Sequence, residues 1–122
     1  MVIGIEHVAI FSKDTTKLKD WYISMFDFTQ VYDNGKGTYF LKAQDGAMIE
    51  FVTADEDCSD KGIKTAGIRH LAINVSDFEG MVKKLEGVEV ITPPAESKGV
   101  KTFFFRDIDG NILHLICREN PL

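Results

Sequence analysis

The sequence predicts an α+β fold in which a strand–helix–strand–strand–strand unit occurs twice. The first observation behind this prediction is a duplicated stretch, because residues 67–77 (GIRHLAINVSD) restate residues 4–14 (GIEHVAIFSKD) without a gap. The second is a duplicated hairpin, in which residues 103–116 align with residues 39–52 and share an Asp-Gly turn. The two offsets are 63 and 64 positions, so a single insertion separates them. Nearly the whole chain is therefore expected to consist of two copies of one unit.

The first unit is expected to begin with a strand over residues 3–11, along which side chains alternate between two faces. On this pattern His7 shares its face with small or apolar neighbours and not with Glu6. A helix of about three turns is expected next, because apolar residues then recur at helical spacing, at Leu18, Trp21, Tyr22 and Met25. Four residues can serve as its N-cap, namely Ser12, Asp14, Thr15 and Thr16.

Three further strands are expected to complete the first unit, at residues 28–32, 38–42 and 47–52. A DNG sequence and a DG sequence separate them, and both are strong turn signals because these residues tolerate positive φ. The last of these strands carries Glu50 among apolar neighbours. Residues 54–65 follow, and their polar, acidic and non-periodic composition predicts a linker.

The second unit is expected to repeat this order, starting with the strand that contains His70. Its helix should be capped by Ser76 or Asp77 and end near Gly87. The strands after this helix are expected at residues 88–91, 102–106 and 111–117. Two prolines, at positions 93 and 94, are expected to end the first of these strands, with a loop over residues 95–101.

The composition excludes several classes of function. The chain has 122 residues, a formal net charge of −5 and 44% hydrophobic residues, which suits one compact domain with a filled core. The absence of a Lys/Arg run argues against nucleic acid as a partner. No window approaches the roughly 18–20 apolar residues that a membrane span needs, and no leader pattern opens the chain. Two cysteines form no disulfide or CxxC framework, so a cytoplasmic protein is expected.

Four polar residues interrupt otherwise apolar strands, and they include every histidine in the chain: His7, Glu50, His70 and His114. In the alignment of the two units, His7 matches His70 and Glu50 matches His114. Packing of the units about a pseudo-twofold axis would bring all four residues together near that axis. Imidazole nitrogens and carboxylate oxygens are ligands of zinc, nickel, cobalt, manganese and iron. The four residues are therefore predicted to bind one divalent transition metal ion.

Each of these residues has a plainer interpretation when it is taken alone. A single strand histidine is more often a half-buried, hydrogen-bonded side chain than a metal ligand, and Glu50 could lie on a solvated face. The coincidence of all histidines with repeat-equivalent positions favours the metal site over these interpretations. A buried carboxylate without a cation would also carry a large desolvation cost.

Four segments together resemble the vicinal oxygen chelate (VOC) superfamily of glyoxalases, bleomycin-resistance proteins and dioxygenases. They are IEHVAIFSKD…LKDWYISMFDF, AMIEFV, IRHLAINVSDFEGMVKKLEG and FFFRDIDGNILHLI. The resemblance implies a single glyoxalase-like domain over residues 1–122, made of modules 1–53 and 66–122. The two βαβββ modules would form an eight-stranded open cup around a metal, commonly in a homodimer. The implied metal ligands are the same four residues, His7, Glu50, His70 and His114.

The resemblance also implies a choice of chemistry. Glyoxalase I (lactoylglutathione lyase) isomerises a hemithioacetal whose two vicinal oxygens are held by the metal, while a ligand carboxylate moves a proton; here Glu50 would be that base. His114 stands where such lyases most often carry a second glutamate, and Phe11 stands where bacterial glyoxalase I has an arginine for glutathione. These departures argue against a two-carboxylate shuttle and against glutathione.

We therefore expect a metal-dependent lyase or isomerase that acts on a small substrate with vicinal oxygens through an enediolate-type intermediate. Two alternatives stay open. One is a metal-dependent dioxygenase of the same superfamily with a site of three histidines and one glutamate. The other is a non-catalytic, small-molecule-binding protein of the bleomycin-resistance kind, which would not need four metal ligands.

Overall fold

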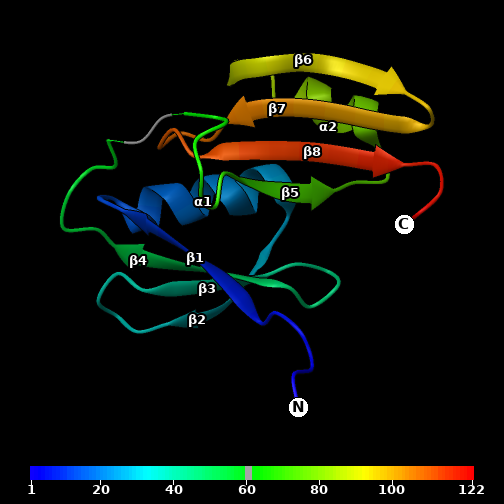
Figure 1. Cartoon of the computed structure of the whole chain (residues 1–122). Helices are drawn as coiled ribbons and strands as arrows, with labels where there is room; N and C mark the ends of the chain where they lie inside the picture. Colours follow the sequence, from blue (N-terminus) through cyan, green and yellow to red (C-terminus); the bar gives the residue numbers. More distant parts are fainter. Residues whose placement is uncertain (60–61) are drawn as a thin grey trace. The chain divides into compact units, whose positions relative to one another are not determined.

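The computed structural model of the chain describes residues 1–59 and 62–122. Its contacts divide the chain into two compact units, Met1–Ser59 and Asp60–Leu122. Each unit contains a four-stranded sheet and one helix, arranged in the predicted order of strand, helix and three strands (Figure 1). The predicted α+β fold with a duplicated βαβββ unit is therefore confirmed. The eight-stranded cup depends on how the two sheets meet, and it stays a prediction.

The first unit contains β1 (His7–Ser12), α1 (Thr15–Phe26), β2 (Thr29–Asp33), β3 (Tyr39–Lys42) and β4 (Met48–Thr53). Its sheet has the strand order β1-β4-β3-β2, in which β1 runs parallel to β4 and the other neighbours are antiparallel. The parallel pair joins the two strands that carry the predicted ligands of this unit.

Helix α1 packs on one face of this sheet and so leaves the other face available. The Asp14 side chain caps the helix by accepting a hydrogen bond of 3.0 Å from the backbone N–H of Lys17. Leu18 and Tyr22 lie one turn apart and are fully buried. The Tyr22 ring contacts Phe51 of β4 with ring centroids 5.2 Å apart. Because side chains alternate along β4, Glu50 points away from the helix.

The second unit contains β5 (His70–Asn74), α2 (Phe78–Lys84), β6 (Glu89–Ser97), β7 (Val100–Arg106) and β8 (Ile112–Arg118). The strand order is β5-β8-β7-β6, and β5 runs parallel to β8. This is the topology of the first unit with each strand replaced by its repeat equivalent. The duplication in the sequence is therefore a duplication of topology.

The core of the second unit lies between its sheet and α2. It is formed by apolar side chains that are nearly or fully buried, namely Phe78, Leu85, Phe103, Phe105, Leu113 and Leu115. The residues between these positions on β7 and β8 point to the opposite face, and they include Phe104 and His114. No helix within the described residues is long and apolar enough to cross a membrane.

The prediction for β6 was wrong. The strand does not end at Pro93-Pro94 but runs through both prolines to Ser97, and the loop expected at residues 95–101 is a hairpin turn at Lys98-Gly99. Strand β6 is an edge strand, and its register shifts on both sides of Thr92, so no ladder hydrogen bond is required from the prolines. The turn residues have φ values of +52° and +77°, as a two-residue hairpin requires.

Two other boundaries also differ from the predictions. Strand β1 starts at His7 rather than at residue 3, so residues 1–6 precede the sheet. Helix α2 is capped by Asp77, one of the two predicted residues, but its C-cap is Leu85 and not Gly87. The residues before His7 have no strand to pair with. Strand β4 begins at Met48, which is the partner of His7.

The turn between β7 and β8 is held by the buried carboxylate of Asp107. Oδ1 accepts hydrogen bonds of 2.9 Å from the backbone N–H groups of Asp109 and Asn111, and Oδ2 accepts one of 2.9 Å from the Asn111 side chain. Replacing Asp107 with alanine removes both acceptor oxygens and with them all three hydrogen bonds. We expect the free energy of unfolding to fall by about 2 kcal/mol, because three hydrogen bonds to a charged group are lost.

Chemical denaturation of the Asp107→Ala variant measures this loss. A matched control is Asp45→Ala in the hairpin of the first unit, where the exposed carboxylate accepts a hydrogen bond of 3.0 Å from Ala47. The control should lose clearly less stability than the variant. Equal losses in the two proteins would contradict the assigned role of Asp107.

Candidate metal centre

In the first unit, two predicted ligands lie next to each other on the face away from α1. His7 is the first residue of β1 and Glu50 lies in β4, where the register pairs Glu50 with Ala9, two residues along from His7. Nε2 of His7 lies 3.6 Å from Oε1 of Glu50. The two side chains are 35% and 25% exposed, so both are partly buried and still accessible to solvent. The structure therefore brings His7 and Glu50 together.

The expectation that Glu6 points away from His7 was wrong. Oε1 of Glu6 lies 2.8 Å from Nδ1 of His7, within hydrogen-bond distance. The expectation assumed that both residues belong to the strand, but the strand begins at His7 and Glu6 precedes it. The alternation of faces therefore does not apply to Glu6, and its carboxylate can reach the ring of the next residue.

In the second unit, the other two predicted ligands also lie together. His70 starts β5 and His114 lies in β8, and their ring centroids are 5.3 Å apart with the ring planes at 87°. Strands β5 and β8 are parallel neighbours, and Ala72, two residues after His70, is paired with His114. The two imidazoles therefore share one end of the sheet face that is opposite to α2.

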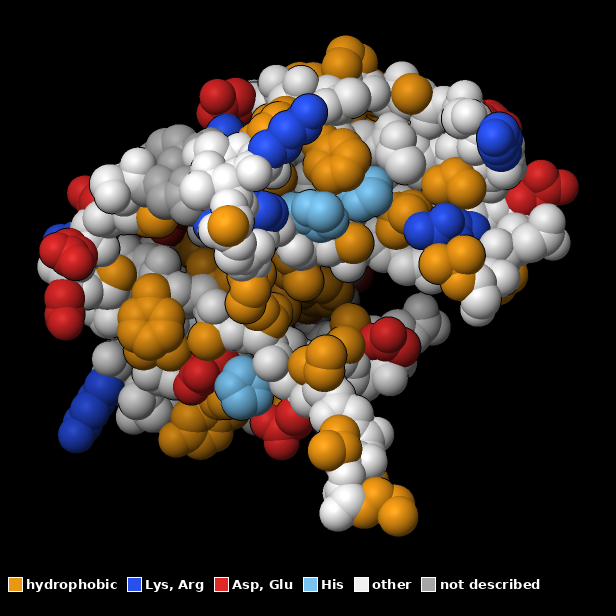
Figure 2. Space-filling model, in the orientation of Figure 1, with side chains coloured by type: hydrophobic (Ala, Val, Ile, Leu, Met, Phe, Trp, Pro, Cys, Tyr) orange, Lys and Arg blue, Asp and Glu red, His pale blue; other side chains and the backbone are white. Residues whose placement is uncertain are grey.

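A phenylalanine supports the histidines in each unit. The ring of Phe104 stacks on His114 with centroids 3.9 Å apart and an angle of 12°, and it meets His70 edge-on at 5.4 Å. Its repeat equivalent, Phe40, meets His7 edge-on at 5.3 Å. Sequence analysis did not assign these two phenylalanines to the site, although their equivalence in the repeat was a usable signal. Figure 2 shows histidine side chains reaching the surface beside hydrophobic ones.

The Nε2 atom of His114 is buried and has no hydrogen-bond partner among the described residues. Burial, and then the nearby His70 and Arg118, lower the pKa of His114 below its ordinary value. The neutral imidazole is therefore favoured, and this is the form that binds metals. A buried polar atom without a partner is rare in proteins and calls for an explanation. A ligand nitrogen that faces a metal position supplies one, so the residue fits the predicted role.

The four predicted ligands thus form two pairs, His7 with Glu50 and His70 with His114, one in each unit. Among residues 1–59 and 62–122, no group of three or more His, Cys, Asp or Glu side chains is arranged to hold a metal ion. That the two pairs share one ion stays a prediction.

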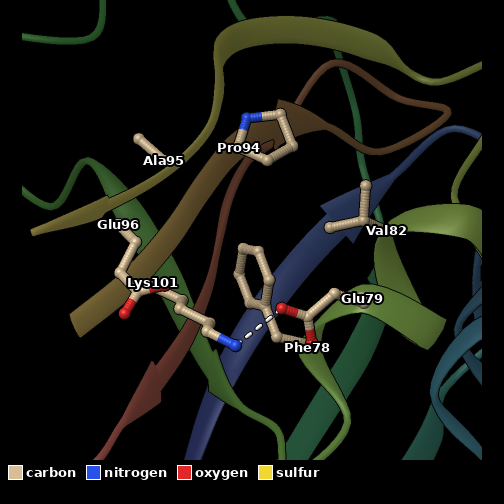
Figure 3. A pocket seen from close by; sticks show the side chains of 7 residues that line it. All are labelled: Phe78, Glu79, Val82, Pro94, Ala95, Glu96 and Lys101. Atoms are coloured by element: carbon tan, nitrogen blue, oxygen red, sulfur yellow. Dashed lines mark hydrogen bonds and ion pairs between the residues drawn. The ribbon is translucent and has the colours of Figure 1, made fainter. Parts of the chain in front are cut away.

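The second unit also has a hollow of about 320 Å³ on its other face, between α2, β6 and β7 (Figure 3). Phe78, Val82 and Pro94 give it apolar walls, and the charged groups at its rim include Glu79 and Lys101. These two are paired at 2.6 Å, an interaction that lowers the pKa of Glu79 and raises that of Lys101. The hollow contains no histidine and lies on the sheet face opposite to His114, so it is separate from the candidate metal ligands.

Comparison with known proteins agrees with this architecture. The chain is 27% identical over 121 residues to the uncharacterized protein YwkD of Bacillus subtilis (strain 168), covering 92% of this chain and 94% of that protein. Among solved structures it is similar to a mutant of the fosfomycin resistance protein FosX from Listeria monocytogenes, complexed with Mn(II) and 1S,2S-dihydroxypropylphosphonic acid. That match has a TM-score of 0.76 and 20% identity, and covers 100% of this chain and 94% of the other.

The chain is also similar to the crystal structure of TioX from Micromonospora sp. ML1, with a TM-score of 0.73 and 15% identity over 94% of this chain and 98% of that one. At such identities these structures show the fold alone. The family model described as Glyoxalase/Bleomycin resistance protein/Dioxygenase superfamily matches residues 4–115, which is most of the chain. The chain therefore belongs to the glyoxalase/bleomycin resistance protein/dioxygenase superfamily.

Proposed function

We propose that this protein is a metal-dependent lyase or isomerase that acts on a small substrate with vicinal oxygens. The observation that carries the proposal is the pair of donor sets, His7 with Glu50 and His70 with His114, placed at equivalent positions of the two units. Each pair lies on the sheet face away from the helix of its unit. In the proposed arrangement, modules 1–53 and 66–122 form one domain, joined by the linker 54–65, and the four residues bind one ion.

The chemistry of the donors supports a divalent transition metal, with zinc, nickel, cobalt, manganese or iron as the candidates. Three imidazoles and one carboxylate would supply four donors to such an ion, and an ion that takes six ligands would have two positions left for substrate oxygens. The buried Nε2 of His114 is consistent with a ligand nitrogen. The Mn(II) in the related FosX structure supports a divalent metal in this superfamily. When bound, such an ion supplies a Lewis acid that stabilises negative charge on the substrate oxygens.

Glu50 is proposed to be the base. Its Oε1 lies 3.6 Å from Nε2 of His7, which leaves Oε2 to take the proton from the hydroxyl-bearing carbon next to the carbonyl and return it to the former carbonyl carbon, while the hydroxyl proton moves to the former carbonyl oxygen. Phe40 meets the His7 ring edge-on and Phe104 stacks on the His114 ring, so each imidazole has an aromatic neighbour. Phe11, which is 60% exposed, follows His7 on the same strand and offers no charge for a substrate carboxylate. This supports a small substrate rather than glutathione.

Metal titration of the untagged protein tests the proposal. Purified apo-protein should bind about one equivalent of zinc or cobalt per chain, because one ion satisfies four protein donors. The measurement is equilibrium dialysis followed by elemental analysis. Less than about a tenth of an equivalent of bound metal, with no recovery of binding on adding nickel or zinc, would contradict the metal site and favour a non-catalytic binding protein.

A dioxygenase is a second candidate function, and one observation favours it. His114 makes the donor set three histidines and one glutamate, and histidine-rich sites with one carboxylate and open positions suit iron(II) oxygenases. Oxygen uptake by the iron(II)-loaded protein in the presence of a catechol separates this reaction from proton transfer. A homodimer, a cytoplasmic location and the lack of a nucleic-acid partner complete the proposal.

A further inference from the structure

We propose that Glu6 is a positioning residue that fixes the tautomer and the ring orientation of His7, so that Nε2 presents its lone pair beside Glu50. The inference rests on the proposed metal site, because it gives Glu6 a role behind one of the four ligands. Glu6 itself does not touch the metal in this proposal. It acts through the imidazole of the residue that follows it.

The argument starts from the two nitrogens of the His7 ring. Nδ1 lies 2.8 Å from Oε1 of Glu6, and Nε2 lies 3.6 Å from Oε1 of Glu50. A neutral imidazole carries its proton on one nitrogen and a lone pair on the other, and a carboxylate only accepts hydrogen bonds. The proton is therefore favoured on Nδ1, which is within hydrogen-bond distance of a carboxylate. Nε2 is beyond that distance from Glu50 and keeps its lone pair.

This arrangement matches the way in which metal-binding histidines are usually supported. Such a histidine donates the N–H that does not face the metal to a carboxylate, carbonyl or water, and this bond sets its tautomer and raises its basicity. The edge of Phe40 holds the His7 ring from another side, with centroids 5.3 Å apart and an angle of 78°. The ring is thus oriented by a hydrogen bond in its plane and by an aromatic contact.

The described part of the second unit, residues 62–122, shows no equivalent of this carboxylate contact. The repeat equivalent of Glu6 is Arg69, 63 positions later. A guanidinium has no acceptor, so it cannot receive a hydrogen bond from His70, and Arg69 instead donates one of 2.9 Å to the carbonyl of Gly62. In that unit the ring of Phe104 contacts both histidines and supplies the orientation. Within residues 1–59 and 62–122, the hydrogen bond from a histidine ring to a carboxylate is therefore seen in the unit that also carries the carboxylate ligand Glu50.

The position of Glu6 before the strand is what makes the contact possible. Within a strand, neighbouring side chains point to opposite faces, so a residue preceding His7 in regular β structure could not reach its ring. Strand β1 begins at His7 because its partner strand begins at Met48. Glu6 is outside the ladder and 71% of its side chain is exposed. Its carboxylate is the part that contacts the His7 ring.

Two variants and one control test the inference. Glu6→Ala removes the acceptor, Glu6→Gln keeps a neutral acceptor of the same size, and Glu56→Gln removes a negative charge from an exposed loop position. Cobalt titration of the untagged apo-proteins should show a loss of affinity of roughly tenfold or more for Glu6→Ala and a smaller loss for Glu6→Gln. Glu56→Gln should bind cobalt as the wild type does.

The second readout needs no metal. Two-bond ¹H–¹⁵N correlation spectra of the apo-protein at about pH 8.5, where imidazole is neutral, report which ring nitrogen carries the proton. We expect Nδ1–H for His7 in the wild type and a shift towards Nε2–H in Glu6→Ala, with Glu6→Gln retaining Nδ1–H. A structural role of Glu6 elsewhere would not change this signature.

The two readouts keep the inference and the proposed function apart. If the wild type binds no cobalt but the tautomer shifts in Glu6→Ala, the metal site fails while the control of His7 by Glu6 stands. An unchanged tautomer in Glu6→Ala overturns the inference, whatever the metal result. A shifted tautomer with unchanged cobalt affinity also overturns it as a statement about metal binding.

Discussion

Replacing Glu50 with glutamine is expected to lower proton-transfer activity by roughly a hundredfold or more, because a positioned general base contributes about 10² to 10⁴ in rate. Glutamine has the same size, and its amide oxygen can still coordinate a metal, but it cannot accept a proton at neutral pH. Metal binding should weaken far less than the activity. The loss of rate without the loss of metal separates the role of base from the role of ligand.

The measurement uses the hemithioacetal of methylglyoxal and a small thiol as the probe. Exchange of the carbon-bound proton with solvent deuterium, followed by NMR, reports proton transfer even where turnover is slow. Glu56→Gln is the matched control, since it makes the same chemical change at an exposed position outside the site. A Glu50→Gln protein that exchanges the proton at the wild-type rate would exclude Glu50 as the base.

Replacing His114 with leucine is expected to weaken metal binding without destabilising the metal-free protein. Metal affinity should fall by more than the roughly 10- to 100-fold that loss of an outer-shell partner costs, because a direct ligand is removed. The free energy of unfolding of the metal-free protein should stay unchanged or rise by about 1–3 kcal/mol, the penalty of a buried polar atom without a partner. An apolar side chain carries no such penalty.

Leu115 provides the control for this prediction, because it lies next to His114 on β8 but points towards the α2 face and is fully buried. Leu115→Ala should lower the free energy of unfolding by about 2–5 kcal/mol and leave the metal affinity of the folded protein unchanged. Cobalt titration and chemical denaturation of both variants provide the data. If His114→Leu destabilises the apo-protein as strongly as Leu115→Ala does, His114 is a packing residue.

Sequence periodicity predicted the order and type of all the described helices and strands. Apolar positions such as Leu18 and Tyr22 recur at helical spacing because one face of α1 must be buried. This spacing can be recognised in the sequence of the helix alone. The errors occurred where the length of an element depends on a partner. Strand β1 is shorter than predicted because the residues before His7 have no strand to pair with. Strand β6 is longer than predicted because an edge strand can continue through Pro93-Pro94.

In the candidate site, too, the local sequence predicted which residues take part, and contacts between distant segments decided the rest. The repeat identified the four polar residues and placed each within an apolar strand, and the structure brings them together as two pairs. Pairing within a unit required the parallel contacts β1–β4 and β5–β8, which join strands far apart in the chain. The support given by Glu6 and by Phe104 was not predicted, since each depends on which rings and carboxylates face one another.

By itself, the sequence determined the duplicated topology, the superfamily resemblance and the identity of the residues on the face away from each helix. These properties follow from local periodicity and from the equivalence of two copies. Only the tertiary structure decided the neighbours of the His7 and His114 rings: Glu50 and Glu6 lie at the two nitrogens of His7, and Phe104 stacks on His114. The physical reason is that strand register and the ends of each ladder are set by pairing between distant segments, and the pattern within one strand does not contain that information.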